Sequence, residues 1–268
     1  MTNTEPAVMP ALFVGHGSPM NALEHNRYTD TWRDYGRSVP TPRAILTISA
    51  HWYINATSVT MMPHPKTIHD FYGFSDELFA VQYPAPGDPD LAAEIIEVVK
   101  PTWVGQDADS WGLDHGTWSV LAHMYPDANI PVVQLSIDAT KDPDYHVNLG
   151  AALAPLRQRG ILIVASGNIV HNLRGLDPAH PDTGFDWARD YDEAATTIMS
   201  EQPGDIATLT DHQHHAHAAP TPDHLLPLFY LAGLAATATT TTNPLITGYA
   251  MGSLSMTCHA LPVAATSA

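Results

Sequence analysis

Four histidines of this chain follow, or are expected to face, the end of an apolar strand or loop segment. They stand in ALFVGHGSP, AILTISAHW, ILIVASGNIVHN and TPDHLLPL, and are His16, His51, His171 and His224. Imidazole binds iron, zinc, copper and nickel, and ligands of open α/β sheets lie outside the carboxyl ends of the strands. The pattern therefore predicts a metal centre whose histidines come from separate elements and meet at one sheet edge.

Two of these histidines have a local sequence that suits a ligand. His16 lies between Gly15 and Gly17, which permit a sharp turn and a close approach of the backbone. His51 comes at the end of the most strand-like segment of the chain, after a run of Ile, Leu, Thr and Ser. We therefore expect both side chains at the metal.

The remaining histidines leave alternatives open. His224 is expected in the first turn of a helix beside Asp223, where either side chain could be the third ligand and where Asp223 could instead cap the helix. His171 is expected to be a fourth ligand or a base near the metal. His115 stands in the polar segment WGLDHGTW, as a substrate-contacting or acid–base histidine, or as a loop histidine bonded to Asp114.

Alternating strands and helices are predicted to position these side chains. Apolar runs rich in β-branched residues predict strands at Ala11–Val14, Ile45–Ser49, Val132–Ser136, Ile161–Ser166 and Ile246–Met256, with a further antiparallel strand at Tyr53–Met62. Helical spacing and capping residues predict helices at Asp88–Lys100, Asp144–Leu156, Trp187–Met199 and Pro222–Leu234. The low-complexity segment Ala235–Asn243 is expected to be an exposed linker. We expect an α/β fold: a single catalytic domain over residues 1–268, with a central, mostly parallel mixed sheet flanked by helices on both faces.

Composition limits the partners. The 268 residues carry a formal net charge of −17 with 11 scattered basic residues, which argues against nucleic-acid binding because phosphate contacts need clustered Lys and Arg. The single cysteine, Cys258, excludes a disulfide framework and a thiolate-rich zinc site. We see no secretory signal and no apolar run of about 18 residues, so we expect a cytoplasmic protein that does not enter the membrane.

Five motifs, GHGSPMNAL, ISAHW, LDHGTW, SGNIVHNLR and DHLLPL, occur in an order that resembles the class III extradiol ring-cleavage dioxygenases of the LigB superfamily. The similarity runs from about Pro10 to about Met256 and is greatest to the 4,5-DOPA extradiol dioxygenase branch. It implies a mononuclear, non-haem metal enzyme that opens the ring of a catechol, an aromatic diol such as DOPA, with O₂. It further implies Fe(II) for activity, with Zn(II) as an ion that the isolated protein can carry.

The resemblance also implies residue roles. The metal ligands carry over to His16, His51 and His224, and two further functional histidines to His171 and His115. We expect His171 to act as a base toward the diol, since an unperturbed imidazole titrates near about pH 6.5, and His115 to orient the substrate or O₂. Arg174, close to His171 in sequence, and Trp111 are further candidate substrate-binding residues.

Two other functions stay open at this point. A zinc-dependent hydrolase or lyase on the same scaffold would use a zinc-bound water. A non-catalytic metal-binding protein would be favoured by the histidine-rich segment Asp211–His217. The identity of the catechol, the ring bond that is cleaved and the oligomeric state do not follow from the sequence.

Overall fold

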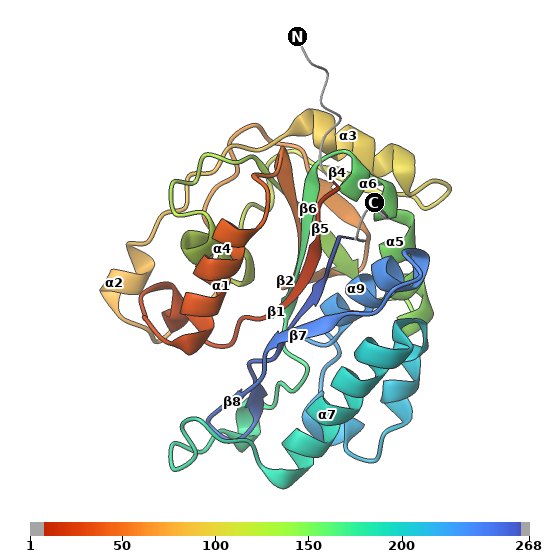
Figure 1. The fold of residues 1–268 in the computed structure, drawn as a ribbon. Helices are drawn as coiled ribbons and strands as arrows, with labels where there is room; N and C mark the ends of the chain where they lie inside the picture. Colours follow the sequence, from red (N-terminus) through yellow and green to blue (C-terminus); the bar gives the residue numbers. More distant parts are fainter. Residues whose placement is uncertain (1–7, 264–268) are drawn as a thin grey trace.

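An eight-stranded mixed sheet runs through the centre of the computed structural model, which describes residues 8–263 (Figure 1). Its strands stand in the order β4-β3-β5-β2-β6-β1-β10-β7. They are β1 (Ala11–Gly15), β2 (Ala44–Ile54), β3 (Ser58–Thr60), β4 (Gly105–Asp107), β5 (Val132–Asp138), β6 (Ile161–Gly167), β7 (Asn243–Ile246) and β10 (Cys258–Leu261). The neighbours β5, β2, β6 and β1 are parallel, so their carboxyl ends share one edge of the sheet.

The outer strands make the sheet mixed. On one side β3 runs antiparallel to β5, and β4 runs parallel to β3. On the other side β10 is antiparallel to β1, and β7 is antiparallel to β10. A separate hairpin of β8 (Tyr249–Ala250) and β9 (Leu254–Ser255) lies outside this sheet. The predicted fold class, α/β with a mostly parallel mixed sheet, is confirmed.

Helices cover both faces of the sheet (Figure 1). The helices α1 (Arg27–Ser38) and α4 (His115–Met124) pack on the face that carries Leu12 and Val14 of β1. The opposite face, with Ala11 and Phe13, is covered by α3 (Pro89–Val98), α5 (Pro143–Ala152), α6 (Ala154–Gln158), α7 (Asp186–Glu201) and α9 (Leu226–Thr237). Shorter elements are α2 (Asp76–Phe79), α8 (His215–Ala218) and the 3-10 helices at Pro19–Ala22, Leu173–Gly175 and Pro203–Asp211.

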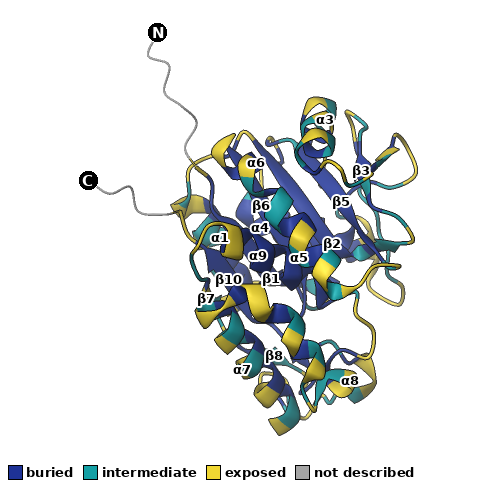
Figure 2. Cartoon of the chain, turned by 90° about the vertical axis from the view of Figure 1, so that its right-hand side faces the viewer, coloured by how far each residue is buried: buried dark blue, intermediate teal, exposed yellow. Residues whose placement is uncertain are grey.

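Burial distinguishes the central elements from the outer ones. The central strands and α9 are buried almost throughout, whereas the outer helices expose one face (Figure 2). An element that is apolar on all sides belongs inside a domain. The predicted strands Ala11–Val14, Ile45–Ser49, Val132–Ser136 and Ile161–Ser166 correspond to β1, β2, β5 and β6, and the predicted helices Asp88–Lys100 and Trp187–Met199 correspond to α3 and α7.

The prediction of one long strand at Ile246–Met256 is wrong. The segment forms the end of β7 and then the β8–β9 hairpin. Met251 and Gly252, with φ of 50° and 77°, adopt the left-handed conformation that reverses the chain between β8 and β9. The predicted strand Tyr53–Met62 is likewise divided. Tyr53 and Ile54 are the last residues of β2, and only Ser58–Thr60 forms the antiparallel strand β3.

Two predicted helices have different bounds, and four helices were not predicted. Asp144–Leu156 is divided between α5 and α6, with a proline in the first turn of α6. The helix expected at Pro222–Leu234 begins at Leu226, so its first turn does not carry His224. The helices α1, α2, α4 and α8 were not predicted, and α4 begins within a segment that was expected to be a loop.

The segment Ala235–Asn243 is only in part the exposed linker that was predicted. The helix α9 continues to Thr237, residues 236–239 are exposed, and Thr242 is buried. Among the described residues, no helix is both long enough and apolar enough to cross a membrane.

Candidate metal centre

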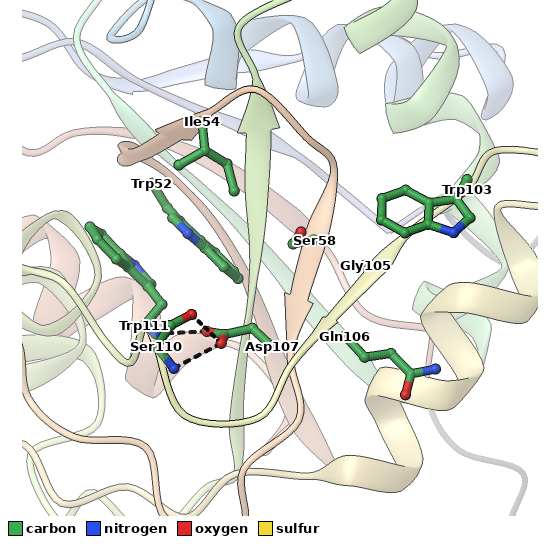
Figure 3. A pocket seen from close by; sticks show the side chains of 9 residues that line it. All are labelled: Trp52, Ile54, Ser58, Trp103, Gly105, Gln106, Asp107, Ser110 and Trp111. Atoms are coloured by element: carbon green, nitrogen blue, oxygen red, sulfur yellow. Dashed lines mark hydrogen bonds between the residues drawn. The ribbon is translucent and has the colours of Figure 1, made fainter.

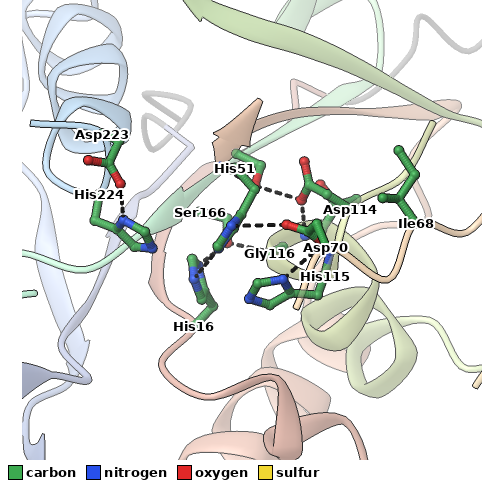
Figure 4. Close-up of polar contacts among 12 residues, drawn as sticks. His16, His51, Ile68, Asp70, Asp114, His115, Gly116, Ser166, Asp223 and His224 are labelled. Carbon is green, nitrogen blue, oxygen red and sulfur yellow. Dashed lines mark hydrogen bonds and ion pairs between the residues drawn. The ribbon is translucent and has the colours of Figure 1, made fainter. Parts of the chain in front are cut away.

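Five histidines from separate segments meet beside the carboxyl ends of the parallel strands. His16 directly follows β1, His51 lies within β2 near its carboxyl end, and His171 comes four residues after β6. His115 is the first residue of α4, and His224 lies in the turn before α9. Figure 4 shows four of them facing a common space, with His224 approaching from the side of α9. The structure therefore brings together all five histidines that the sequence singled out.

Distances between ring centroids group His16, His51 and His224 together and set the other two histidines apart. The ring centroids of His16, His51 and His224 lie 5.0, 5.0 and 5.4 Å apart. The centroid of His115 is 3.8 Å from that of His51 and 5.6 Å from that of His16. His171 stacks on His224, with 3.5 Å between centroids and 3° between the ring planes. His171 is thus placed behind one of the three nearly equidistant rings.

His16 is held by the neighbouring strand β6. Its backbone N–H donates to the carbonyl of Gly167 at 3.0 Å, which continues the pairing of β1 with β6. Its ring Nδ1 lies 2.9 Å from Ser166 Oγ, and Ser166 Oγ itself donates to the carbonyl of Gly116 at 2.6 Å. Because the hydroxyl hydrogen is committed to that carbonyl, Ser166 accepts a hydrogen bond from Nδ1–H of His16. The lone pair of His16 is therefore on Nε2.

His51 and His115 are both bound by Asp70. Nδ1 of His51 lies 3.0 Å from Asp70 Oδ2, and Nδ1 of His115 lies 2.9 Å from Asp70 Oδ1. The helix start at His115 can approach β2 because residue 116 is glycine: a Cβ there would lie 2.9 Å from Cδ2 of His51 and 2.5 Å from Ser49 Oγ. Glycine at this position thus permits the close packing of the two histidines.

The turn that carries His224 rests on the end of β6. The backbone N–H of Asn168 donates to the carbonyl of His224 at 2.9 Å, and a Cβ at Gly167 would lie 2.2 Å from that carbonyl oxygen. Asp223 binds Nδ1 of His224, while α9 has no side-chain cap, so the alternative of Asp223 as a helix cap is wrong. Nε2 of His224 is again the free ring nitrogen.

Burial keeps most of these rings neutral. It lowers the pKa of His16 well below its ordinary value, lowers that of His115, and lowers those of His224 and His171 to about 4 and about 2. Burial also opposes a charge on His51, but its hydrogen bond to Asp70 and the nearby acidic groups raise the pKa of this ring. Neutral imidazole is the form that binds a metal.

The donor atoms fit a metal ion. Nε2 of His51 lies 3.1 Å from Nε2 of His16. Two ring nitrogens with lone pairs at this distance need a proton or a cation between them. Histidine nitrogens bind zinc at about 2.0–2.1 Å, so two ligands of one ion in octahedral or tetrahedral geometry have nitrogens roughly 2.9–3.4 Å apart.

Ring separations distinguish His115 from His224 as the third ligand. Ligand atoms of His16, His51 and His115 all lie within 4.8 Å of one another, so these three alone form a compact group. However, centroids of imidazoles bound to one ion should be roughly 4.5–5.2 Å apart, given the metal–nitrogen length above. The separation of 3.8 Å between His51 and His115 is too short, whereas 5.0 and 5.4 Å from His224 to His51 and His16 fit better. Ring geometry therefore favours His224.

Two predicted substrate-binding residues lie apart from the histidines. Arg174 is exposed, and its backbone N–H donates to Asn172 Oδ1. The indole N–H of Trp111 donates to Asp114 Oδ2 at 3.3 Å, and its ring stacks on Trp52 with 5.8 Å between centroids. Trp111 lines a pocket of about 540 Å³ at the β3–β4 side of the sheet, to which none of the five histidines contributes (Figure 3). Substrate binding by either residue stays a prediction.

Asp114 and the histidine-rich segment Asp211–His217 make contacts other than the predicted ones. His115 does not bond to Asp114, which caps α4 by accepting from the N–H of Thr117 and receives a hydrogen bond from Ser49 Oγ. In the histidine-rich segment Asp211–His217, Nδ1 of His215 is hydrogen-bonded to the hydroxyl of Tyr191. Within residues 8–263, these histidines do not form a compact ligand group.

Asp70 and Ser166 are the site residues that the sequence interpretation missed. Ser166 ends a predicted strand, which was a usable signal, and its Oγ lies 2.9 Å from Nδ1 of His16. Asp70 stands in the segment HDFYGF, outside any helix or strand, and only its position beside an aromatic-rich stretch distinguishes it.

The chain resembles known proteins along most of its length. Residues 11–257 match the family model described as the catalytic LigB subunit of aromatic ring-opening dioxygenase. A protein of Escherichia coli (strain K12) named 4,5-DOPA dioxygenase extradiol is 46% identical over 252 residues, which are 92% of this chain and 93% of that protein. A protein of the same name from Mirabilis jalapa is 35% identical over 232 residues, 83% and 85% of the two chains.

A solved structure agrees with these matches. The crystal structure of an uncharacterized protein from Escherichia coli K12 superposes with a TM-score of 0.83 at 41% identity, covering 95% of this chain and 100% of that one. The chain thus belongs to the LigB family of aromatic ring-opening dioxygenases. The resemblance inferred from the five motifs is confirmed, and with it the class of enzyme, an extradiol ring-cleavage dioxygenase with a metal site that includes three histidines.

Proposed function

We propose that the protein binds one Fe(II) through His16, His51 and His224 and uses O₂ to open the ring of a catechol with a DOPA-like side chain. The observation that carries the proposal is the convergence of three nearly equidistant rings, 5.0–5.4 Å apart. Each has Nδ1 engaged by another side chain, so Nε2 remains for the ion. Metal-binding histidines usually have such a partner on the second nitrogen. The names of the relatives support a substrate of the DOPA type.

An Fe(II) held by His16, His51 and His224 would supply the redox chemistry between the diol and O₂. In the overall reaction one ring carbon–carbon bond next to the diol breaks, and both atoms of O₂ enter the product. The surrounding residues handle protons and orientation. His171 stacks on His224 beside the three rings, and we assign it the role of accepting a proton from the diol and later returning it. A base placed in this way contributes about 10²–10⁴-fold to the rate.

His115 has a different part in the proposal. Its Nδ1 is bound to Asp70, so the lone pair on Nε2 is available to a diol hydroxyl. Its ring lies against Phe71, with 5.5 Å between centroids and 78° between planes, which restricts the orientation of the imidazole. We assign it the orientation of the substrate or O₂, at a position too close to His51 for a second bond to the same ion.

Reconstitution tests the proposal. The apoprotein, loaded anaerobically with Fe(II), is mixed with O₂ and catechols that differ in the side chain, including dihydroxyphenylalanine. We expect O₂ uptake and a yellow ring-opened product, whose structure identifies the bond that was cleaved. The absence of O₂ uptake with every catechol, with iron bound, would refute the proposal. The same protein loaded with Zn(II) and tested on esters and amides is the control, because hydrolysis there would support the zinc hydrolase.

The partners in this proposal are small molecules only. The formal net charge of −17 supports this, since a polyanion would be repelled. A cytoplasmic location is part of the same proposal and is supported by the single cysteine, which is buried and free.

A further inference from the structure

Asp70 lies between two of the five histidines and contacts both of them (Figure 4). Its Oδ2 is 3.0 Å from Nδ1 of His51, and its Oδ1 is 2.9 Å from Nδ1 of His115. Oδ1 also accepts the backbone N–H of His115 at 3.0 Å. The side chain is 15% exposed, so water competes little for these contacts. One carboxylate thus links a proposed metal ligand with a histidine that is proposed to face the substrate.

The loop that carries Asp70 is fixed on both sides. The backbone N–H of Ile68 donates to the carbonyl of Leu113 at 2.7 Å, and the indole N–H of Trp118 donates to the carbonyl of Ile68 at 2.8 Å. The next residue after Asp70, Phe71, packs its ring edge-on against His115. The position of the carboxylate is therefore determined by α4 and by the segment before it.

The position of Asp70 makes it an acceptor toward both rings. Its two carboxylate oxygens lie within hydrogen-bond distance of the Nδ1 atoms of His51 and His115, and Oδ1 also accepts the backbone N–H of His115. An ionised carboxylate only accepts hydrogen bonds, so each histidine must donate from Nδ1. The tautomer of both rings, and hence the location of both lone pairs on Nε2, follows from this single side chain.

We propose that Asp70 is a shared positioning residue, which holds His51 with Nε2 toward the metal and His115 with Nε2 toward the substrate. The assignment rests on the proposed function of the site. Metal loading and substrate orientation then depend on the same carboxylate. Asp223 offers a matched comparison, because it contacts Nδ1 of His224 and has no such link to His115.

Substitution of the two aspartates tests this arrangement. In Asp70→Asn the amide keeps one acceptor oxygen, while its NH₂ group faces the N–H of a ring. We expect Zn(II) affinity, measured by competition with a chelator, to fall by about 10- to 100-fold in D70N and in D223N, as for other partners of metal ligands. Thermal unfolding of the metal-free variants shows whether each one is folded.

Turnover at saturating Fe(II) separates the two aspartates. If Asp70 acts on the substrate through His115, the fold decrease in turnover of D70N/H115A will be no larger than that of H115A alone. In the matched control D223N/H115A, we expect the fold decreases of the two single variants to multiply, because Asp223 does not act through His115. Wild-type zinc affinity in D70N, or losses that multiply in D70N/H115A as they do in the control, would overturn the proposal.

A measurement on the wild-type protein keeps the proposal testable if the variants fold poorly. In the ¹⁵N-labelled, Zn(II)-loaded protein, long-range ¹H–¹⁵N spectra report which ring nitrogen carries the proton. We expect Nδ1–H in both His51 and His115, with Nε2 of His115 unprotonated. A proton on Nε2 of His115 would refute the shared role. The affinity and NMR readouts use zinc and do not depend on turnover, so inactivity of the iron-loaded wild type toward every catechol would refute the proposed function while these two readouts still decide the role of Asp70.

Discussion

Gly167→Ala provides a quantitative test of how β6 supports the proposed ligand His224. A Cβ at this position would lie 2.2 Å from the carbonyl oxygen of His224 and 3.1 Å from Cγ of Pro227. A backbone carbonyl cannot rotate out of the way as a side chain can, so the turn before α9 must shift. The hydrogen bond from Asn168 N–H to the same carbonyl, 2.9 Å long, would be disturbed as well.

The expected cost follows from two opposing effects. Overpacking in a buried region costs about 1–3 kcal/mol, and replacement of a glycine in a strand returns about 0.5–1 kcal/mol. We expect a net loss of roughly 1–2 kcal/mol in the free energy of unfolding, which corresponds to a decrease of about 2–8 °C in Tm. Zn(II) affinity should also fall, because the shift moves a proposed ligand.

The assay compares Gly167→Ala with Gly204→Ala. At Gly204 a Cβ would meet only the Cβ of Ala236, at 3.6 Å, which is an ordinary contact. Calorimetry and chelator competition are applied to both variants and to the wild type. If Gly167→Ala unfolds at the same temperature as Gly204→Ala and binds Zn(II) as the wild type does, the inferred support of the His224 turn by β6 is wrong.

Three further predictions concern single histidines. His224→Ala should abolish stoichiometric binding of Fe(II) or Zn(II), while His115→Ala should retain it, as measured by elemental analysis after dialysis; the reverse result would assign His115 as the third ligand. His171→Ala should keep its metal and lose about 10²–10⁴-fold in turnover, whereas loss of the metal would make His171 a ligand. His259 lies buried between the hydroxyls of Thr196 and Thr242, and burial lowers the pKa of its ring to about 4. Because this folded-state pKa is below the ordinary 6.5, its contribution to stability is present above about pH 6.5 and is lost as the pH falls toward 4. Urea unfolding at pH 7 and pH 5 should therefore show a smaller pH dependence for His259→Gln than for the wild type, and an equal dependence would contradict the assignment.

Much of the scaffold follows from local sequence. The strands β1, β2, β5 and β6 are buried on both faces, so each appears as a continuous apolar run. The helix α4 was missed because its N-terminal cap, Asp114, stands in a polar segment bracketed by tryptophans that resembles a loop. The region Ile246–Met256 was extended too far, since the left-handed conformation of Met251 is not one that its side chain favours.

By itself, the sequence determined the family, through five motifs in order, and predicted five histidines that the structure brings together. His16, His51 and His171 follow from local sequence, because residues at or just after the ends of parallel strands are confined to one sheet edge. His115 and His224, at the start of a helix and in a turn, rested on the resemblance of their motifs. The tertiary structure alone decided how these histidines are arranged and which side chains hold each of them. His224 lies in a turn supported by Gly167, His171 stacks behind it, and Asp70 binds His51 and His115 together. These relations join residues far apart in the chain, and they depend on strand order and on side-chain distances that no local pattern encodes.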